Sequence, residues 1–155
     1  MKPHMDGERY SKPAIALHWL MAVLLIAQVG MGWYMVDLPK KTPAVAFWYG
    51  LHKSFGLTVF ALLMVRIWWR SRHTPPEYEG HDSAVLARSA RAAHFLLYAC
   101  MFATPVCGYL SSAFGKHAVK FFGIALPQLF HEDATLVTLF RQMHWAFSWL
   151  MVVLV

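Results

Sequence analysis

The sequence has few charged residues. Asp, Glu, Lys and Arg together make up 14% of the 155 residues, whereas hydrophobic residues make up 58%. Soluble globular domains carry about 25% charged and about 45–50% apolar residues. This shortage of charge excludes an ordinary soluble domain and predicts an all-α membrane protein with one domain over residues 1–155.

Acidic residues number eight against fourteen Lys and Arg, which gives a formal net charge of +6. A positive charge is one mark of nucleic-acid binding. Here, however, the basic residues lie between apolar runs, where Lys and Arg set the orientation of a membrane protein. We therefore expect contact with membrane lipid and no nucleic-acid partner.

Cysteine is also rare, with Cys100 and Cys107 as the only two in the sequence. On one helix they would lie about 10 Å apart, which is too far for a disulfide bond. We expect both to be packing residues.

Four apolar runs predict four helices, at about residues 14–36, 44–70, 90–114 and 137–155. The first three are long enough to cross a membrane, which takes about 20 residues. The apolar run after Arg141 ends at Val155 and is shorter than this, so we expect the fourth helix to be truncated in the sequence. The apolar segment 121–130 is interrupted by Pro127 and is expected to lie along the membrane surface.

Lys and Arg are unevenly distributed between the two sides of these runs. By the positive-inside rule, the richer side faces the cytoplasm, so the N-terminus is predicted to be cytoplasmic. That side carries Lys2, Arg9, Lys12, Arg66, Arg70, Arg72, Arg88 and Arg91, and the outer side carries Lys40, Lys41, Lys116, Lys120 and Arg141.

Histidines are the most informative polar residues. Four of the nine lie in or at the ends of the apolar runs, namely His18, His52, His94 and His144. An ionisable side chain in a membrane helix suggests a functional site, although a histidine can also bond a neighbouring helix. The other five are expected to be solvated loop residues: His4, His73, His81, His117 and His131.

The predicted depths of the four membrane histidines form two pairs. With a rise of about 1.5 Å per residue, His52 and His144 fall near the outer face, whereas His18 and His94 fall near the cytoplasmic face. Two facing imidazoles suit a haem iron, and a bis-histidine haem transfers electrons because no coordination position stays open. Zinc is the competing ligand, but it usually needs three or four ligands in one cluster.

Short motifs in chain order carry a family resemblance. They are Ala16-Leu17-His18-Trp19, Leu51-His52-Lys53-Ser54-Phe55-Gly56, Met64-Val65-Arg66, His73-Thr74-Pro75-Pro76, Ala93-His94-Phe95-Leu96-Leu97-Tyr98, Ala103-Thr104-Pro105-Val106-Cys107-Gly108, Phe121-Phe122-Gly123-Ile124-Ala125-Leu126-Pro127 and Met143-His144-Trp145. With these motifs the sequence resembles the bacterial cytochrome b561 family, which is related to the cytochrome b subunits of nickel–iron hydrogenase and formate dehydrogenase.

The resemblance implies a four-helix transmembrane bundle with two b haems. His52 and His144 would ligate the outer haem, and His18 would ligate the inner one. The partner of His18 would lie about 14 residues after His144, at position 158, beyond Val155. In a complete chain His94 would have to replace it. The family has a histidine at this position that is not the usual ligand, and we expect it to bond a propionate, a quinone or a backbone carbonyl.

Basic residues near the histidines are candidates for the haem propionates. Arg66 is the strongest near the inner haem, together with Arg70 and Arg72, because arginine pairs with carboxylates bidentately. Lys53 and Arg141 are candidates near the outer haem, and Lys53 could also attract an anion. For each except Arg66, setting the topology is an equally good explanation.

These features favour a membrane cytochrome that passes electrons between a donor at the outer face and quinone, with ubiquinone as the expected acceptor. Some relatives oxidise superoxide, which suggests that anion as a donor. The alternative is a haem-b anchor subunit that relays electrons for a separate dehydrogenase or hydrogenase. A histidine-relay transporter or channel would be a third class, and it would be colourless.

Overall fold

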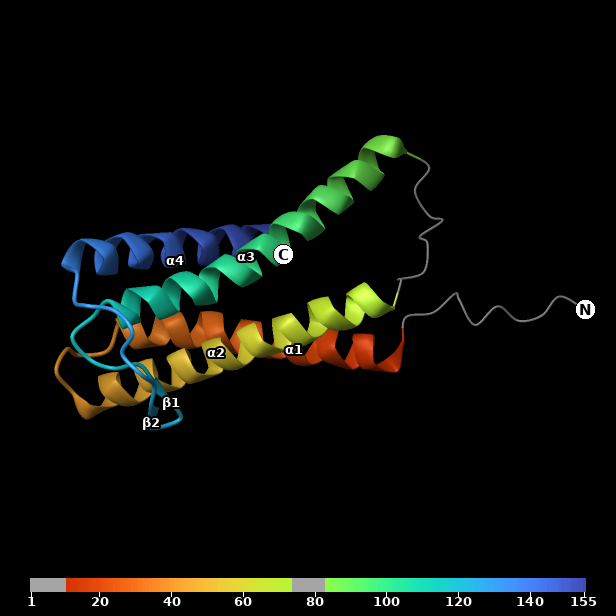
Figure 1. Cartoon of the computed structure of the whole chain (residues 1–155). Helices are drawn as coiled ribbons and strands as arrows, with labels where there is room; N and C mark the ends of the chain where they lie inside the picture. The colour runs from red at the N-terminus through yellow and green to blue at the C-terminus, as the bar shows by residue number, and fades with distance from the viewer. Residues whose placement is uncertain (1–10, 74–82) are drawn as a thin grey trace, which may run out of the picture.

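The computed structural model describes residues 11–73 and 83–155, and these form a helical bundle (Figure 1). The expectations for Lys2, His4, Arg9, Thr74-Pro75-Pro76 and His81 fall outside these ranges. In chain order the elements are α1 (Lys12–Val36), α2 (Pro43–Arg72), α3 (Ala84–Ala113), β1 (Lys120–Phe121), β2 (Ile124–Ala125) and α4 (Ala134–Leu154).

The predicted four-helix membrane bundle is confirmed. By length and composition, α1, α2 and α3 can each cross a membrane. All four helices begin earlier than predicted, and α3 and α4 differ the most. α3 begins at Ala84 rather than near residue 90, so Arg88 also lies on this helix, because alanine, leucine and arginine there are good helix formers.

α4 begins at Ala134 rather than 137 because Asp133 caps it. The Asp133 carboxylate accepts hydrogen bonds from the backbone N–H groups of Thr135 and Leu136, at 2.8 and 3.0 Å. Acidic and hydroxyl side chains at this position satisfy the first free N–H groups of a helix. The helix therefore includes the residues just before Arg141, and His144 lies near its middle.

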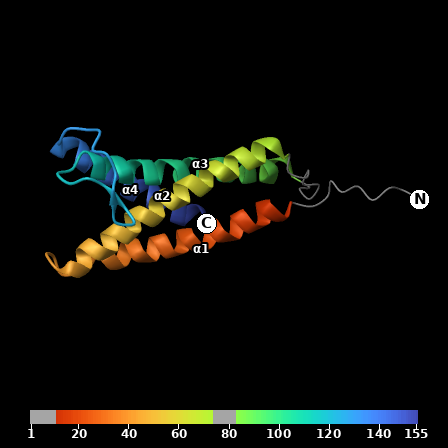
Figure 2. The same cartoon turned by 60° about the horizontal axis from the view of Figure 1, so that its bottom comes forward.

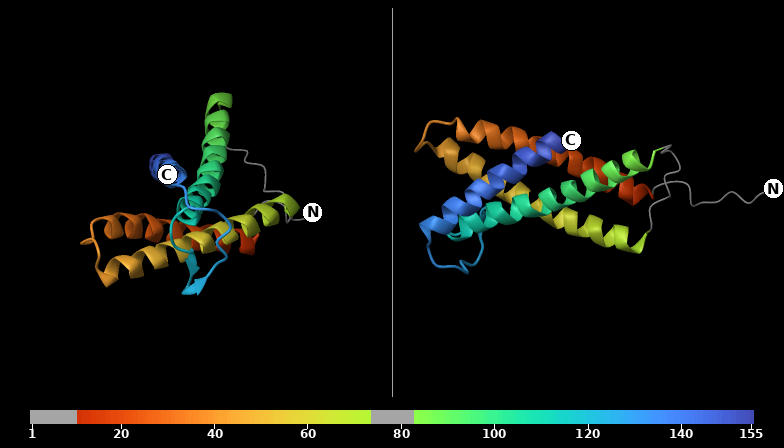
Figure 3. Two further views of the ribbon diagram at one scale, coloured as in Figure 1. Left: turned by 60° about the vertical axis from the view of Figure 1, so that its left-hand side comes forward. Right: turned by 90° about the horizontal axis from the view of Figure 1, so that it is seen from above.

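The helices pack as two antiparallel pairs, α1 with α2 and α3 with α4, and α2 also packs against α3. α4 lies beside α3 (Figure 3), and its C-terminal part meets α1 through Trp33 and Trp149, whose ring centroids are 5.8 Å apart. Cys100 and Cys107 are buried and free, which confirms their predicted packing role.

The connection between α3 and α4 contains an antiparallel β-hairpin that the sequence analysis did not predict. The hairpin lies over α2 near the start of that helix (Figure 2). Its turn residues Phe122 and Gly123 have φ values of 45° and 90°, a conformation that glycine adopts freely. The Phe122 backbone N–H donates to Ser54 Oγ at 2.9 Å, and the Phe122 ring meets Phe55 edge to face.

Ser54→Ala is expected to loosen this hairpin. Ser54 is 2% exposed, so the variant leaves the Phe122 N–H without its partner. The loss should be about 1 kcal/mol and should speed limited proteolysis within residues 118–128. Ser89→Ala is the control, since the Ser89 hydroxyl bonds only to Val85 O on its own helix. Equal cleavage rates for both variants would contradict the anchoring function of Ser54.

Candidate functional site

The structure brings together the two histidines predicted for the outer face. His52 on α2 and His144 on α4 have ring centroids 6.0 Å apart and ring planes inclined at 84°. Both side chains are half-buried. The pair joins the α1–α2 half of the bundle to the α3–α4 half, at a common depth, as the spacing along the two helices predicts.

His144 is held in a defined orientation by α3. Its Nδ1 atom lies 2.8 Å from the backbone carbonyl oxygen of Thr104. A carbonyl oxygen only accepts hydrogen bonds, so Nδ1 carries the proton in this contact. Nε2 then keeps its lone pair, which is the usual arrangement in a metal-binding histidine.

His52 is held through its backbone rather than its ring. Its carbonyl oxygen accepts a hydrogen bond from Gln28 Nε2 of α1 at 2.9 Å. Within the described part of the chain, the buried Nδ1 atom of His52 has no hydrogen-bond partner. Gly32 of α1 is close, since a Cβ added there would lie 3.6 Å from His52 Cε1. On this side the His52 ring therefore packs against α1 at a residue without a side chain.

This geometry fits an iron atom bound by both imidazoles. With ring centroids 6.0 Å apart, the two imidazoles are close enough to hold one metal ion between them. Across residues 11–73 and 83–155, no group of three or more His, Cys, Asp or Glu side chains is placed to hold a metal. Two histidines suffice for haem, because the porphyrin supplies the other ligands.

The other predicted pair is not brought together. His18 and His94 are both exposed, and both lie toward the end of the bundle where α1 and α3 begin. No hydrogen bond or ring contact between them is found among the described residues. Figure 1 shows the reason, because the first half of α3 diverges there from α1 and α2.

Arg66 lies in a polar cluster between α2 and α3 that the sequence analysis predicted only in part. Its Nε donates to the Tyr98 hydroxyl at 3.0 Å, and Arg70 Nη1 lies 3.5 Å from the same oxygen. Among the described residues, the buried Nη1 of Arg66 has no partner. Tyr98 was not singled out beforehand, although it follows His94 by one helical turn on α3.

The remaining basic candidates differ in their surroundings. Lys53 is half-buried beside His52, whereas Lys120 is exposed on β1. The Lys116 ammonium lies 3.8 Å from the Glu132 carboxylate, and both side chains are exposed. Arg72 rests over the Trp68 ring at 5.8 Å, which gives it a packing function.

Three of the histidines assigned to loops lie in the described ranges, and all are exposed as expected: His73, His117 and His131. His73 also stacks on Trp69, with centroids 4.1 Å apart. The His73 side chain is therefore held at the end of α2 by this stacking and is not simply surrounded by solvent.

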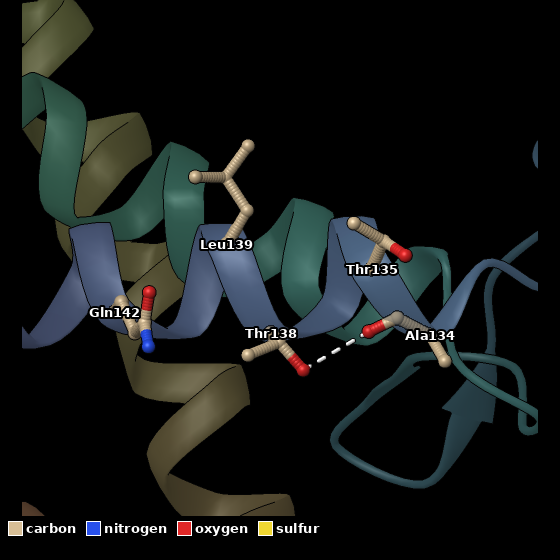
Figure 4. A pocket seen from close by; sticks show the side chains of 5 residues that line it. All are labelled: Ala134, Thr135, Thr138, Leu139 and Gln142. Atoms are coloured by element: carbon tan, nitrogen blue, oxygen red, sulfur yellow. Dashed lines mark hydrogen bonds between the residues drawn. The ribbon is translucent and has the colours of Figure 1, made fainter.

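A pocket lies at the start of α4 (Figure 4). It has a volume of about 470 Å³ and is lined by Ala134, Thr135, Thr138, Leu139 and Gln142. With about 100° of rotation per residue, Thr135, Thr138 and Gln142 fall on the face of α4 opposite His144. The pocket therefore does not contribute to the proposed iron site.

The sequence is similar to known proteins along nearly its whole length. A family model described as prokaryotic cytochrome b561 matches residues 9–155. Cytochrome b561 homolog 2 of Escherichia coli (strain K12) is 32% identical over 152 residues, which cover 95% of this chain and 79% of that protein. Cytochrome b561 homolog 1 of the same strain is 24% identical, covering 89% of this chain and 80% of that protein.

A third relative carries a functional name. It is the probable superoxide oxidase CybB of Yersinia pestis, which is 24% identical over 88% of this chain and 77% of that protein. The family match, the apolar helices and the paired histidines agree with one another. This chain belongs to the prokaryotic cytochrome b561 family, and it is a bacterial membrane cytochrome that binds haem b and transfers electrons.

Proposed function

We propose that this protein carries two b haems across the bacterial inner membrane and passes electrons from a donor at the outer face to ubiquinone. The N-terminus faces the cytoplasm in this proposal, in accord with the Lys and Arg distribution. The observation that supports it most strongly is the 6.0 Å separation of the His52 and His144 rings, on two different helix pairs.

At the outer face, His52 and His144 would hold the haem iron through their imidazoles. A haem with two histidine ligands supplies one-electron transfer and leaves no coordination position for O₂. The hydrogen bond from His144 Nδ1 to Thr104 O keeps the His144 ring in one tautomer. α1 contributes Gly32, which lies next to the His52 ring.

At the inner face, His18 would be one axial ligand, roughly 20 Å from the outer pair along the helices. Arg66 is the residue proposed to bind a propionate, because its buried Nη1 has no partner among the described residues. Tyr98 holds the other side of this guanidinium through Nε. His94, one turn from Tyr98, is proposed to bond a propionate or the quinone rather than the iron.

Superoxide is the proposed donor. Two superoxide anions would each give up one electron and leave as O₂, while one ubiquinone takes up two electrons and two protons. Lys53 beside His52 and Lys120 on β1 provide positive charge that attracts an anion to the outer face. The relative from Yersinia pestis that is named a probable superoxide oxidase supports the same donor.

Purified protein supplied with superoxide and ubiquinone is expected to produce ubiquinol, measured by the fall in quinone absorbance. Lys53→Gln should slow the reaction and weaken its dependence on ionic strength, since the attraction is electrostatic. His131→Ala, an exposed change, is the control. No superoxide-dependent ubiquinol formation by the haem-loaded protein would overturn the proposed donor. Co-purification with a dehydrogenase subunit would then favour the anchor function.

A further inference from the structure

α3 approaches the His144 ring most closely at Gly108. A Cβ added to Gly108 would lie 2.9 Å from His144 Nδ1 and 3.1 Å from Cε1. Carbon atoms in van der Waals contact are about 3.5–4.0 Å apart, so a side chain at this position would displace the ring. Only glycine allows the imidazole to rest directly on the backbone of α3.

The same turn of α3 provides the hydrogen-bond acceptor for this ring. Thr104 is four residues before Gly108, so the two residues lie on one face of the helix. The Thr104 carbonyl accepts from His144 Nδ1 at 2.8 Å. A ring displaced by a side chain at residue 108 would no longer have this contact geometry. The missing Cβ and the carbonyl therefore act on the same imidazole.

The other glycines in the bundle do not constrain a histidine in this way. At Gly32 an added Cβ would make ordinary contact with His52 Cε1, at 3.6 Å. At Gly30 and Gly50 an added Cβ would meet no atom of the described residues within 4 Å. The histidine pair is thus asymmetric, because only His144 is fixed on both its position and its tautomer.

We infer that Gly108 is a positioning residue for His144. Its lack of a side chain seats the ring against α3, where the Thr104 carbonyl fixes the Nδ1 proton and leaves Nε2 free. The α3–α4 pair therefore holds the His144 imidazole in a defined position and tautomer. This inference rests on the proposed function of His144 as an axial ligand.

The test compares Gly108→Ala with Gly50→Ala in protein purified from haem-replete cells. Gly108→Ala is expected to keep the inner haem and to bind the outer haem at least about 10-fold more weakly, as for other lost supporting contacts of metal ligands. Its residual outer haem should show a changed low-spin electron paramagnetic resonance signal, because the ring is rotated. Gly50→Ala should match the unaltered protein in both measurements.

Thr104→Val tests the identity of the acceptor. The backbone carbonyl remains in this variant, so haem content and spectrum should not change.

Alanine is a better helix former than glycine, so haem loss in Gly108→Ala would not arise from helix propensity. An unchanged outer haem in Gly108→Ala would overturn the inference, and so would loss of both haems, which would indicate a general packing defect. Retention of both haems by His144→Ala would instead overturn the ligand function itself.

Discussion

His144→Ala is expected to remove the outer haem and to leave the inner haem in place. Without its imidazole, α4 presents no ligand to an iron shared with His52, whose ring is 6.0 Å away in the intact protein. The haem content per protein chain should fall by about half, because one of the two proposed sites is lost. Reduced-minus-oxidised spectra and a haem assay on the purified protein measure this directly.

His52→Ala should give the same loss, and the double variant should lose no more than either single one. This non-additivity follows because both side chains would bind one iron. His117→Ala is a matched control, since this histidine is exposed in the connection before β1. Different haem contents for the two single variants, or a further loss in the double variant, would contradict a shared outer haem.

His18→Ala is expected to abolish electron transfer to quinone while the outer haem stays reducible. His18 lies near the start of α1, at the end of the bundle opposite the His52–His144 pair. Superoxide should therefore still reduce the remaining haem in a stopped-flow experiment, but ubiquinol formation should cease. The α-band of the reduced protein should lose the contribution of the inner haem.

His94→Ala separates the two explanations of the inner site. If His94 supports a propionate or the quinone, the variant keeps both haems and shows weaker quinone reduction. Loss of the inner haem from His94→Ala would show instead that this histidine is the axial partner of His18. Full haem content and full activity in His18→Ala would remove His18 from the proposed site altogether.

The sequence predicted the elements whose signals are local. Runs without charge predicted the four helices, and a fixed rise per residue was enough to place His52 and His144 at one depth. Asp133 shows where such reasoning stopped short. Its side chain caps α4, whereas the charge-free run that predicted this helix begins only after Arg141.

Other features depend on how the helices pack beside one another, and the depth of a residue in the membrane does not determine this. His18 and His94 were assigned to one level, but the divergence of α3 separates helices whose histidines share that level (Figure 1). The hydrogen bond from His144 to Thr104 uses a backbone carbonyl, so no residue type in the sequence indicates it. The β-hairpin depends on a left-handed backbone conformation at Phe122. The Phe122 N–H is bound by Ser54 of α2, which is far away in the sequence, so the sequence around Phe122 does not reveal this partner.

The distribution of the outer histidine pair over two helix pairs has a consequence for biogenesis. His52 enters the membrane with the first hairpin, whereas His144 is synthesised only after α3 and the connection to α4. Because bacterial chains grow at about 5–20 residues per second, His144 is synthesised several seconds or more after His52. If the two histidines share one haem as proposed, haem loading at this position would follow the insertion of α4.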